Sequence, residues 1–538
     1  MYEQLKEYIV QNEYKKALYE LQEEYLCLQE KSDEEAANLF ILEATLWEAL
    51  ADSAAEFDAI QKGLYYDNTN YELYYMLGLY FININVNWAY LCMEMALFYC
   101  KDEDDHAVIE SSFEEIKNRK GIRVKNTSIM ILSYNDLGLV KECIASIEEQ
   151  LPKGSFEIVV VDNSSTEKGV IEYLREKRDN ADYDFKLIES SENLGFPKGC
   201  NLGANACRKE NDILFLNNDA VLTPLSLFWL RMGLYDSRNV GATGPLSNSA
   251  SLQEVDISEF ADLIPEDISE KAKAEDVKWH KLMPFSEALE IFKEYSSRRS
   301  VPLDIPYQRA FRLTGFALLL SRNAIREIEE DGCIFDESFS PGYFEDDDLG
   351  IRLAKAGFEQ YICLNSFVYH NGGSGFEGHN NAMEAGRERF RAKWGFDVWG
   401  YCLPLEEACE KVLEEAKKHK RPLRVIDFSC GFGANAAYLK EKCKGIFVAG
   451  VCRTSEEAGI AGLIADECIY GDPNTIRLPW PDHTFDVVIA DSEYVSRGQA
   501  GRCLAPGGLW FGDPGEQKYG MINYNHDTRR IVDELPEL

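Results

Sequence analysis

The stretch ILFLNNDAVL, residues 213–222, holds the feature that decides how this chain folds. Its apolar residues predict a buried strand, and the run ends in Asn217, Asn218 and Asp219 before an apolar pattern resumes. Burying an unpaired carboxylate costs several kcal/mol even after relaxation. We therefore expect a positively charged or hydrogen-bonding group to compensate the Asp219 carboxylate. The surrounding sequence is used below to infer what that group is.

The composition of the 538-residue chain is that of a globular protein with about three or four domains. Hydrophobic residues make up 45% of the chain and charged residues 28%, which excludes a disordered protein. The formal net charge is −37, and so acidic a surface repels nucleic acid and anionic lipid. We therefore expect no nucleic-acid partner.

The cysteine pattern favours a reducing compartment. Fifteen cysteines are scattered without a CxxC pair, and the His/Cys spacing shows no zinc pattern. The opening residues MYEQLKEYIVQNEYKK do not resemble a secretory signal, and no apolar run reaches the roughly 18 residues that a membrane span needs. We expect a cytoplasmic protein with free thiols and no membrane span, and we leave the oligomeric state open.

Residues 1–120 are predicted to be a helical domain, because Leu, Tyr, Glu and Ala recur at helical spacing and proline is absent. The segment YELYYMLGLYF resembles the first helix of a tetratricopeptide repeat, and small residues follow where its second helix needs them. The matching positions are Tyr74, Leu77, Gly78, Phe81, Ala89, Met93 and Ala96. Stacked helix pairs would leave a concave face for a partner; a generic helical bundle is the alternative.

Residues 121–400 are predicted to be an α/β domain. Four apolar segments are its first strands: SIMIL (128–132), EIVVV (157–161), FKLIE (185–189) and DILFL (212–216). Helical patterns separate these segments, so the sheet is expected to be parallel with right-handed crossovers. In such sheets ligands bind beyond the carboxyl ends of the strands. Residues 253–300 are predicted to be a charged helical insert that acts as a lid or spacer.

Polar residues follow three of these strands directly: Ser133-Tyr134-Asn135, Asp162-Asn163-Ser164 and Asn217-Asn218-Asp219. At a strand end, Asp162 is suited to accept from a base N–H, with a plain Asx-turn as the alternative. Asp219 is suited to Mn²⁺ or Mg²⁺, which prefer oxygen ligands and diphosphate. The alternative makes Asp219 the N-cap of the helix that TPLSLFWL begins.

Two further motifs carry charged or glycine-rich patterns. NLGFPKGCNLG, residues 193–203, brings glycines and Lys198 to a helix start, where a phosphate is favoured. In FDESFSPGYFEDDDLGIRLAKAGF, residues 335–358, four acids open an amphipathic helix whose inner face is expected to include Leu349, Leu353 and Ala356. The helix dipole explains one or two of the acids, so one is expected to be functional. His370 then ends a strand, where a metal role is plausible.

In this order and spacing, the segments resemble inverting family 2 glycosyltransferases of the GT-A fold, in the rhamnosyltransferase-like branch. The matching segments are SIMILSYND, EIVVVDNSS, ENLGFPKGCNLGA, LFLNNDAVL, LTGFALLLSR, FDESFSPGYFEDDDLGIRLAKAGF and VYHNGGS, between residues 127 and about 395. The resemblance implies transfer of a sugar from a UDP- or dTDP-linked donor to an acceptor hydroxyl, with inversion and with Mn²⁺ or Mg²⁺ as cofactor. The sugar, hexosyl or N-acetylhexosaminyl, is not specified.

The same resemblance implies roles for individual residues. Asp346 is the catalytic base, and Glu345 contacts the acceptor. The donor site comprises Ser133, Tyr134, Asp162, Asn193, Lys198, Asn217 and Asn218. Asp219 and His370 are the metal ligands, although Asn217 replaces an acid at the metal motif. The acceptor is expected to be a surface or flagellar protein of a bacterium, with a polysaccharide or lipid-linked glycan as the alternative.

Residues 401–538 carry a second alternating unit. VIDFSCGFGANAAYL resembles the first motif of class I methyltransferases, which implies a Rossmann-like domain with a SAM-like site at Asp427, Gly431 and Gly433. Three departures weaken that function: Ser429 replaces a glycine, Cys452 replaces the ribose-binding acid, and the chain between 491 and 506 is short for the usual helix. We expect a degenerate domain with SAM binding unlikely; a live methyltransferase or a scaffold is the alternative.

Overall fold

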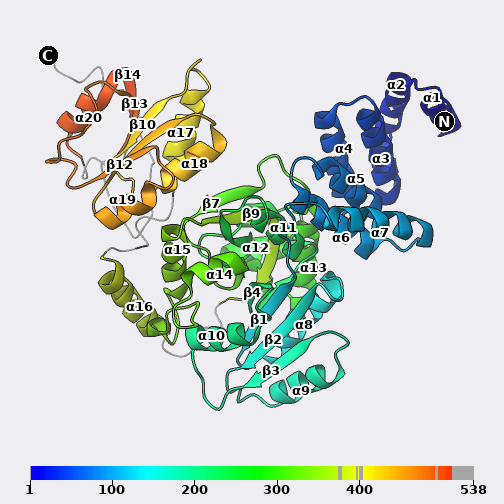
Figure 1. Ribbon diagram of the computed structural model, residues 1–538, viewed down its shortest axis with the longest axis horizontal. Helices are drawn as coiled ribbons and strands as arrows, with labels where there is room; N and C mark the ends of the chain where they lie inside the picture. The colour runs from blue at the N-terminus through cyan, green and yellow to red at the C-terminus, as the bar shows by residue number, and fades with distance from the viewer. Residues whose placement is uncertain are drawn as a thin grey trace.

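The computed structural model describes residues 2–275, 277–372, 379–395, 398, 404–490 and 495–511. A central α/β unit lies between an N-terminal group of helices on one side and a smaller C-terminal α/β unit on the other (Figure 1). Within the described ranges, no helix is long and apolar enough to cross a membrane.

The first 117 residues are entirely helical where they are described, as the sequence predicts. The elements are α1 (Tyr2–Val10), α2 (Tyr14–Tyr25), η1 (Leu28–Glu30), α3 (Asp33–Ala49), α4 (Ser53–Tyr66), α5 (Tyr71–Phe81), α6 (Val86–Tyr99) and α7 (Glu103–Lys117). Ser32 and Glu35 form a capping box at the start of α3. Gly78 lets α5 approach α6, since a Cβ there would lie 2.8 Å from Met93 Cε.

Helices α3 to α7 share one hydrophobic core with the central unit, while α1 and α2 pack against α3 in a separate cluster. The ring of Tyr74 on α5 packs edge-on against Phe228, 5.6 Å between centroids, and Trp88 Nε1 donates to the Met232 carbonyl at 2.7 Å. Arg231, which is buried, forms an ion pair with Glu94 on α6. The N-terminal helices are therefore a packed extension of the central unit.

The central unit contains a nine-stranded sheet in the order β3-β2-β1-β4-β8-β6-β9-β5, with β7 paired to β9. The strands are β1 (Thr127–Ser133), β2 (Phe156–Asp162), β3 (Phe185–Glu189), β4 (Asp212–Asn217), β5 (Ala220–Leu222), β6 (Val240–Leu246), β7 (Tyr307–Ala310), β8 (Ala317–Leu320) and β9 (Glu359–His370). The first four strands are mutually parallel, as predicted, but β8 is antiparallel to β4 and to β6. The prediction of a wholly parallel sheet is thus wrong: β6 and β9 are parallel, but β5 and β7 are antiparallel to β9. In the described part of the chain, no crossover helix lies between β4 and β5 or between β7 and β8, so the strand–helix alternation that the prediction assumed is interrupted there.

Helices cover both faces of this sheet (Figure 1). They are α8 (Leu137–Gln150), α9 (Val170–Asn180), α10 (Phe196–Ala206), α11 (Ser226–Leu234), α14 (Arg322–Ile328) and α15 (Glu345–Lys355). The short η4 (Glu337–Phe339) and α16 (His379–Trp394) lie at the periphery of the unit (Figure 1). In α15, Leu349 and Leu353 are buried as predicted, but Ala356 lies past the helix end and is exposed. Two glycines of α10 allow close packing on β1, since a Cβ at Gly199 would lie 2.4 Å from Leu132.

The predicted insert is a packed layer over β9 and β5. It comprises η2 (Ile257–Phe260), α12 (Glu266–Glu275), η3 (Trp279–Lys281) and α13 (Phe285–Arg299). Its aromatic core includes Phe260 and Phe292, and Phe292 stacks on Phe367 of β9 at 5.7 Å. The insert therefore has its own buried contacts with the sheet.

The C-terminal unit is a five-stranded parallel sheet in the order β12-β11-β10-β13-β14. Its elements are α17 (Glu406–Ala416), β10 (Arg424–Asp427), α18 (Ala434–Lys442), β11 (Phe447–Cys452), α19 (Ser455–Ala461), β12 (Glu467–Tyr470), β13 (Phe485–Ile489), α20 (Arg497–Cys503) and β14 (Leu504–Phe511). The expectation of too little chain for a helix before β14 is wrong, because α20 needs only seven residues. Residues 512–538 of the predicted domain lie outside the described ranges.

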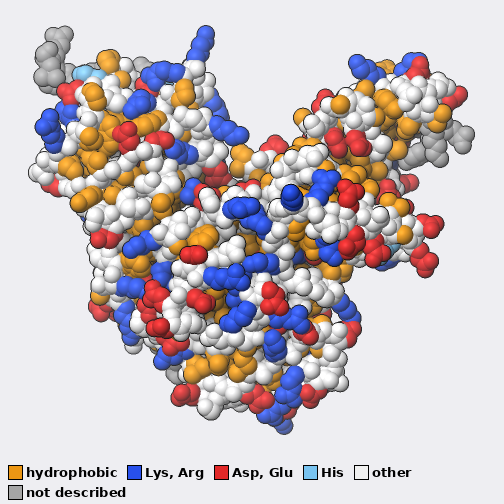
Figure 2. Space-filling view, in the orientation of Figure 1, with side chains coloured by type: hydrophobic (Ala, Val, Ile, Leu, Met, Phe, Trp, Pro, Cys, Tyr) orange, Lys and Arg blue, Asp and Glu red, His pale blue; other side chains and the backbone are white. Residues whose placement is uncertain are grey.

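The surface is not uniformly acidic despite the net charge. In Figure 2, Lys and Arg side chains lie among acidic ones over the central unit, whereas acidic side chains gather over the N-terminal helices at the right. The acidic excess is therefore distributed unevenly over this face.

Candidate active site

The carboxyl ends of β1 and β2 form a buried polar pocket. Ser133 and Asp162 are register partners in the two parallel strands and are 0% and 4% exposed. Asp162 Oδ2 accepts from the Ser165 N–H, three residues further along the chain, at 3.3 Å. Ser133 Oγ and Asp162 Oδ1 have no hydrogen-bond partner within the described part of the chain. Buried polar atoms normally find partners, so this pair is suited to a polar ligand.

Two asparagines join the loops that follow β2 and β3. Asn163 Nδ2 donates to Asn193 Oδ1 at 3.0 Å, and the Leu194 N–H donates to Asn163 Oδ1 at 2.7 Å. Gly195 has φ +74°, and a Cβ there would lie 2.7 Å from Pro341 Cα. Lys198 is exposed on α10. Asn193 therefore holds the predicted donor loop in shape, while the role of Lys198 stays a prediction.

The loops after β1 and β4 also meet. Asn218 Nδ2 donates to the Asn135 carbonyl at 3.3 Å, and the Asn217 N–H donates to the Phe316 carbonyl at 2.8 Å. Tyr134 lies between these loops and the solvent, with 42% of its surface exposed. The sequence singled out all of these strand ends, and the sheet brings them to one edge (Figure 1).

Asp219 and His370 are brought together by β5 and β9. Ala220 pairs with His370 in antiparallel register, and His370 Nε2 lies 3.4 Å from Asp219 Oδ1. His370 Nδ1 lies 2.7 Å from the Ser249 carbonyl, which can only accept, so Nδ1 carries the hydrogen. In the neutral ring, Nε2 then directs its lone pair at the carboxylate. Asp219 is not the N-cap of α11, a position that Leu225 occupies.

The carboxylate and imidazole of this pair fit a divalent cation. One oxygen and one imidazole nitrogen are donors that Mn²⁺ accepts, and diphosphate oxygens would complete the shell. The carbonyl behind the ring fixes its tautomer, an arrangement common behind metal-binding histidines.

Residues that the sequence analysis missed orient His370. Asn248 Oδ1 accepts from the His370 N–H at 2.9 Å, and Asn248 Nδ2 donates to the His370 carbonyl at 2.9 Å. The Phe316 ring stacks on the imidazole at 4.8 Å. Asn248 and Ser249 belong to the segment SNSAS that follows β6, and this polar end of another strand was the available signal.

Two of the four acids at the start of α15 form ion pairs within the protein. Asp348 is fully buried and forms ion pairs with Arg352 at 2.8 Å and Lys393 at 2.6 Å. Asp347 forms an ion pair with the buried Arg312 at 2.9 Å, although burial raises the pKa of this carboxyl to about 7. These contacts explain Asp347 and Asp348 without a ligand.

Glu345 is 7% exposed, and its Oε2 has no hydrogen-bond partner among the described residues. Burial, and then the charge of Asp346, raise the pKa of Glu345 well above its usual range. Its Oε2 is therefore available to a polar ligand. Its predicted contact with an acceptor stays a prediction.

Asp346 differs from its neighbours because its side chain is half-buried. Its Oδ1 accepts from the Asp347 N–H at 2.9 Å, and its Oδ2 accepts from the Gly315 N–H at 3.2 Å. Gly315 precedes Phe316, whose ring stacks on His370. Two consecutive residues of one loop therefore contact the Asp346 carboxylate and the His370 ring. Gln253 holds that loop by accepting from the Thr314 N–H at 2.7 Å.

Lysine side chains of the insert lie beside this edge. Lys281 Nζ donates to Asn371 Oδ1 at 3.0 Å, and the Asn371 N–H donates to the Asp219 carbonyl at 3.0 Å. Lys278 Nζ donates to the Asn248 carbonyl at 3.1 Å. Both lysines are exposed, so the insert brings positive charge next to the Asp219–His370 pair.

In the predicted SAM-like site, both oxygens of the aspartate already have hydrogen-bond partners within the protein. Asp427 ends β10 fully buried, and both its oxygens accept: Oδ1 from the Ser429 N–H at 2.9 Å and Oδ2 from Asn435 Nδ2 at 2.8 Å. Gly431 and Gly433 have positive φ, and a Cβ at Gly433 would lie 3.3 Å from Ala461 Cα. Cys452 is buried at the end of β11, where its thiol donates to the Gly431 carbonyl at 3.6 Å.

Comparisons with known proteins match two parts of the chain. Residues 128–245 match the family model of Glycosyl transferase family 2. A demethylmenaquinone methyltransferase of Thermus thermophilus is 32% identical over 119 residues, which cover 19% of this chain and 54% of that protein. The chain thus spans about half the length of this curated relative.

Solved structures match with low similarity. The crystal structure of GalNAc-T7 with UDP, GalNAc and Mn²⁺ is 12% identical, with a TM-score of 0.36 and coverage of 51% of this chain and 49% of that one. The mannosyltransferase PcManGT of Pyrobaculum calidifontis, in complex with GDP-Man and Mn²⁺, is 13% identical, with a TM-score of 0.35 and coverage of 66% and 84%. The family match, together with the sheet, identifies a glycosyltransferase family 2 domain with a GT-A-like α/β fold in this chain.

Proposed function

We propose that this protein is an inverting, metal-dependent glycosyltransferase that moves a hexosyl or N-acetylhexosaminyl group from a UDP- or dTDP-linked donor to an acceptor hydroxyl. The observation that carries the proposal is the convergence of Asp219, His370 and Asp346 around one loop, residues 314–316. We divide the chain into domains at 1–120, 121–400 and 401–538.

The unpartnered atoms of Ser133 and Asp162 support binding of a pyrimidine base. The carboxylate of Asp162 is an acceptor for the ring N–H of uracil or thymine, and Ser133 offers a hydroxyl to a carbonyl oxygen. Asn217 and Asn218, at the next strand end, contact the ribose and diphosphate in this proposal. A purine would be accepted less well, since its size differs from that of a pyrimidine.

The diphosphate end of the donor lies beside Asp219 and His370, which hold Mn²⁺ or Mg²⁺. A bound divalent cation supplies positive charge to the diphosphate as it leaves. Lys281 and Lys278 add positive charge from the insert, next to Asn371 and Asn248. On donor binding the lysines would exchange their present partners, which for Lys278 include the Glu254 carboxylate at 2.8 Å, for phosphate oxygens.

Asp346 acts as the general base. Two backbone N–H groups orient its carboxylate, and its half-buried position leaves it accessible to an acceptor hydroxyl. Asp346 takes the proton while the hydroxyl oxygen attacks the anomeric carbon and the bond to the diphosphate breaks. A single displacement inverts the anomeric configuration. Glu345, beside it, contacts the acceptor in this arrangement.

The end domains handle the acceptor. The helix pairs of residues 1–117 form a tetratricopeptide-like extension joined to the catalytic unit through Tyr74 and Phe228. This supports a protein acceptor, such as a surface or flagellar protein modified in the cytoplasm. The C-terminal sheet has the strand order of a SAM-binding fold, but buried Cys452 replaces the acid that would hold ribose. We therefore assign it as a degenerate methyltransferase-like domain.

A donor panel tests this proposal. Donor hydrolysis and thermal shift are measured with UDP-, dTDP- and GDP-sugars, with and without Mn²⁺, and with SAM as a separate ligand. We expect a metal-dependent response to one pyrimidine donor and no response to SAM. Absence of any donor response would contradict the enzyme assignment, and a response to SAM would contradict the degenerate assignment of the C-terminal domain.

A further inference from the structure

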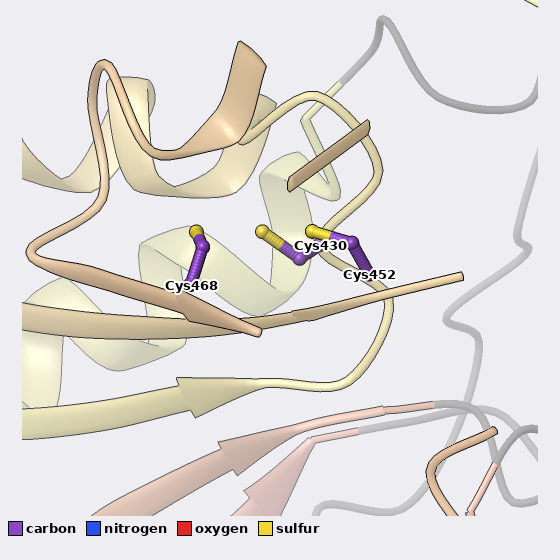
Figure 3. Close-up of side chains that lie close together, drawn as sticks. All are labelled: Cys430, Cys452 and Cys468. Atoms are coloured by element: carbon purple, nitrogen blue, oxygen red, sulfur yellow. The ribbon is translucent and has the colours of Figure 1, made fainter. Parts of the chain in front are cut away.

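Three cysteine thiols meet inside the C-terminal unit. Cys430 lies in the loop after β10, Cys452 ends β11 and Cys468 lies in β12. Their Sγ atoms all lie within 4.8 Å of one another. Figure 3 shows the three sulfur atoms on the same side of the strands, with Cys430 between the other two.

The sheet itself creates this meeting. Strands β10, β11 and β12 are adjacent and parallel, and Gly450 of β11 pairs in register with Cys468. A Cβ at Gly450 would lie 2.4 Å from Cys430 Sγ and 3.0 Å from Cys468 Sγ. The glycine therefore keeps open the space in which the sulfur atoms lie.

The cluster is enclosed by apolar neighbours. Cys430 and Cys452 are 2% and 1% exposed, and α19 covers them through Ala458 and Ala461. No other His, Cys, Asp or Glu of the described ranges joins the three sulfur atoms as a ligand group. The site thus offers three soft donors and no hard ones.

We propose that Cys430, Cys452 and Cys468 bind a single thiophilic d¹⁰ metal ion, Cu⁺ or Zn²⁺. Metal–sulfur bonds of about 2.3 Å place the sulfur atoms of such a site roughly 4 Å apart, which the observed cluster accommodates. Thiolate ligands select these soft ions over Mg²⁺ or Mn²⁺. Three ligands suffice for Cu⁺, whereas Zn²⁺ takes a water or a thiol from solution as its fourth.

Binding exchanges protons for the metal ion. Each thiol that becomes a ligand releases its proton to solvent, so no oxidant or reductant takes part. The ion joins three neighbouring strands at the edge where Cys452 replaces the ribose-binding acid. In this role it stabilises the C-terminal sheet at a position that a nucleoside would otherwise occupy. This site is independent of the glycosyltransferase assignment.

Metal titration of the full chain tests the proposal. The reduced, metal-stripped protein is titrated separately with Cu⁺ and with Zn²⁺ against competing chelators, and bound metal is counted by mass spectrometry after desalting. We expect about one ion per chain to be retained from one of the two titrations. Cys430→Ser, Cys452→Ser and Cys468→Ser should each lose that ion, while Cys503→Ser, another buried cysteine of the same unit, should keep it.

A spectroscopic measurement on the unsubstituted protein covers the case in which a variant fails to fold. X-ray absorption at the edge of the retained metal should show a first shell of sulfur alone for Cu⁺, or of sulfur with one lighter atom or a further sulfur for Zn²⁺. Failure of the unsubstituted chain to retain either ion would overturn the proposal. Retention by all three variants, or a first shell dominated by oxygen and nitrogen, would overturn it equally.

Discussion

Asp162 and Asp427 end parallel strands in two different sheets of this chain, yet their environments are opposite. Asp162 leaves Oδ1 without a hydrogen-bond partner in the described chain, beside the equally unpartnered Ser133 Oγ. Asp427 has both oxygens occupied by Ser429 and Asn435. An aspartate at a strand end therefore marks a ligand site only when the fold leaves its acceptor atoms available.

The neighbouring strand ends extend this contrast. In the central sheet, the next positions carry polar groups, with Asp219 3.4 Å from His370. In the C-terminal sheet, the corresponding edge is filled by buried thiols, including Cys452. Both edges are formed by the carboxyl ends of parallel strands, but polar side chains lie at one and buried thiols at the other. The following experiments test that difference.

The largest effect is expected at the proposed base. Asp346→Asn should lower kcat by about 10²–10⁴-fold with donor affinity retained, because the acceptor hydroxyl loses its proton acceptor. Glu327→Gln, which removes an exposed carboxylate of α14, is the control and should leave kcat unchanged. Steady-state kinetics with the responding donor provide the measurement. Equal losses of kcat in the two variants would contradict the assignment of Asp346 as the general base.

A smaller effect is expected at the metal pair. Asp219→Asn and His370→Gln should each raise the Mn²⁺ concentration required for half-maximal donor hydrolysis by about 10–100-fold, since one ligand is lost. His419→Gln, an exposed histidine of the C-terminal unit, should leave the Mn²⁺ dependence unchanged. Unaltered metal dependence in the first two variants would remove both residues from the metal site.

A comparable or smaller effect is expected at Asp162, where the nucleoside base is proposed to bind. Asp162→Asn should weaken nucleoside-diphosphate binding by about 10–100-fold, because a charge-assisted hydrogen bond contributes roughly 1.5–3 kcal/mol. Asp427→Asn, the corresponding strand end in the other sheet, should not change that affinity. Isothermal titration calorimetry with UDP measures both. If Asp427→Asn weakened UDP binding as much as Asp162→Asn does, the two strand ends would not differ in ligand binding as proposed.

The smallest effect concerns the pH dependence of stability. Burial raises the pKa of Asp427 to about 7, so the folded chain keeps a proton that the unfolded chain releases near pH 4. The free energy of unfolding should therefore fall as pH rises from about 4 to about 7, and Asp427→Asn should flatten that slope by about 1 kcal/mol per pH unit. Urea unfolding of the C-terminal unit, measured in a chelator, provides the check. An unchanged slope would mean that Asp427 titrates alike in both states.

The sequence predicted the polar edge because its elements are local. Each of Asp162, Asp219 and His370 follows an apolar strand directly, so strand prediction alone places it at a sheet edge. Their meeting depends on strand order, which the resemblance to a known family supplied. The distinction among the four acids at 345–348 was not predictable, because it depends on the distant partners Arg312 and Lys393.

The cysteine cluster was missed for the same reason. Cys430, Cys452 and Cys468 have no metal-binding spacing in the sequence, and only the parallel pairing of β10, β11 and β12 brings them together. Likewise, Asn248 orients His370 across 122 positions of chain. Local patterns predict what stands at a strand end, whereas pairing between strands decides what stands opposite it.

The contact of Tyr74 with Phe228 limits how the helical region can change in evolution. A stack of helix pairs grows by adding a pair at an open end, and the end formed by α5 and α6 is closed by α11 of the central unit. The central unit thus covers this end of the helical group. Helices can be added or removed without disturbing that contact on the side of α1, so longer or shorter helical groups would keep the same junction with the central unit.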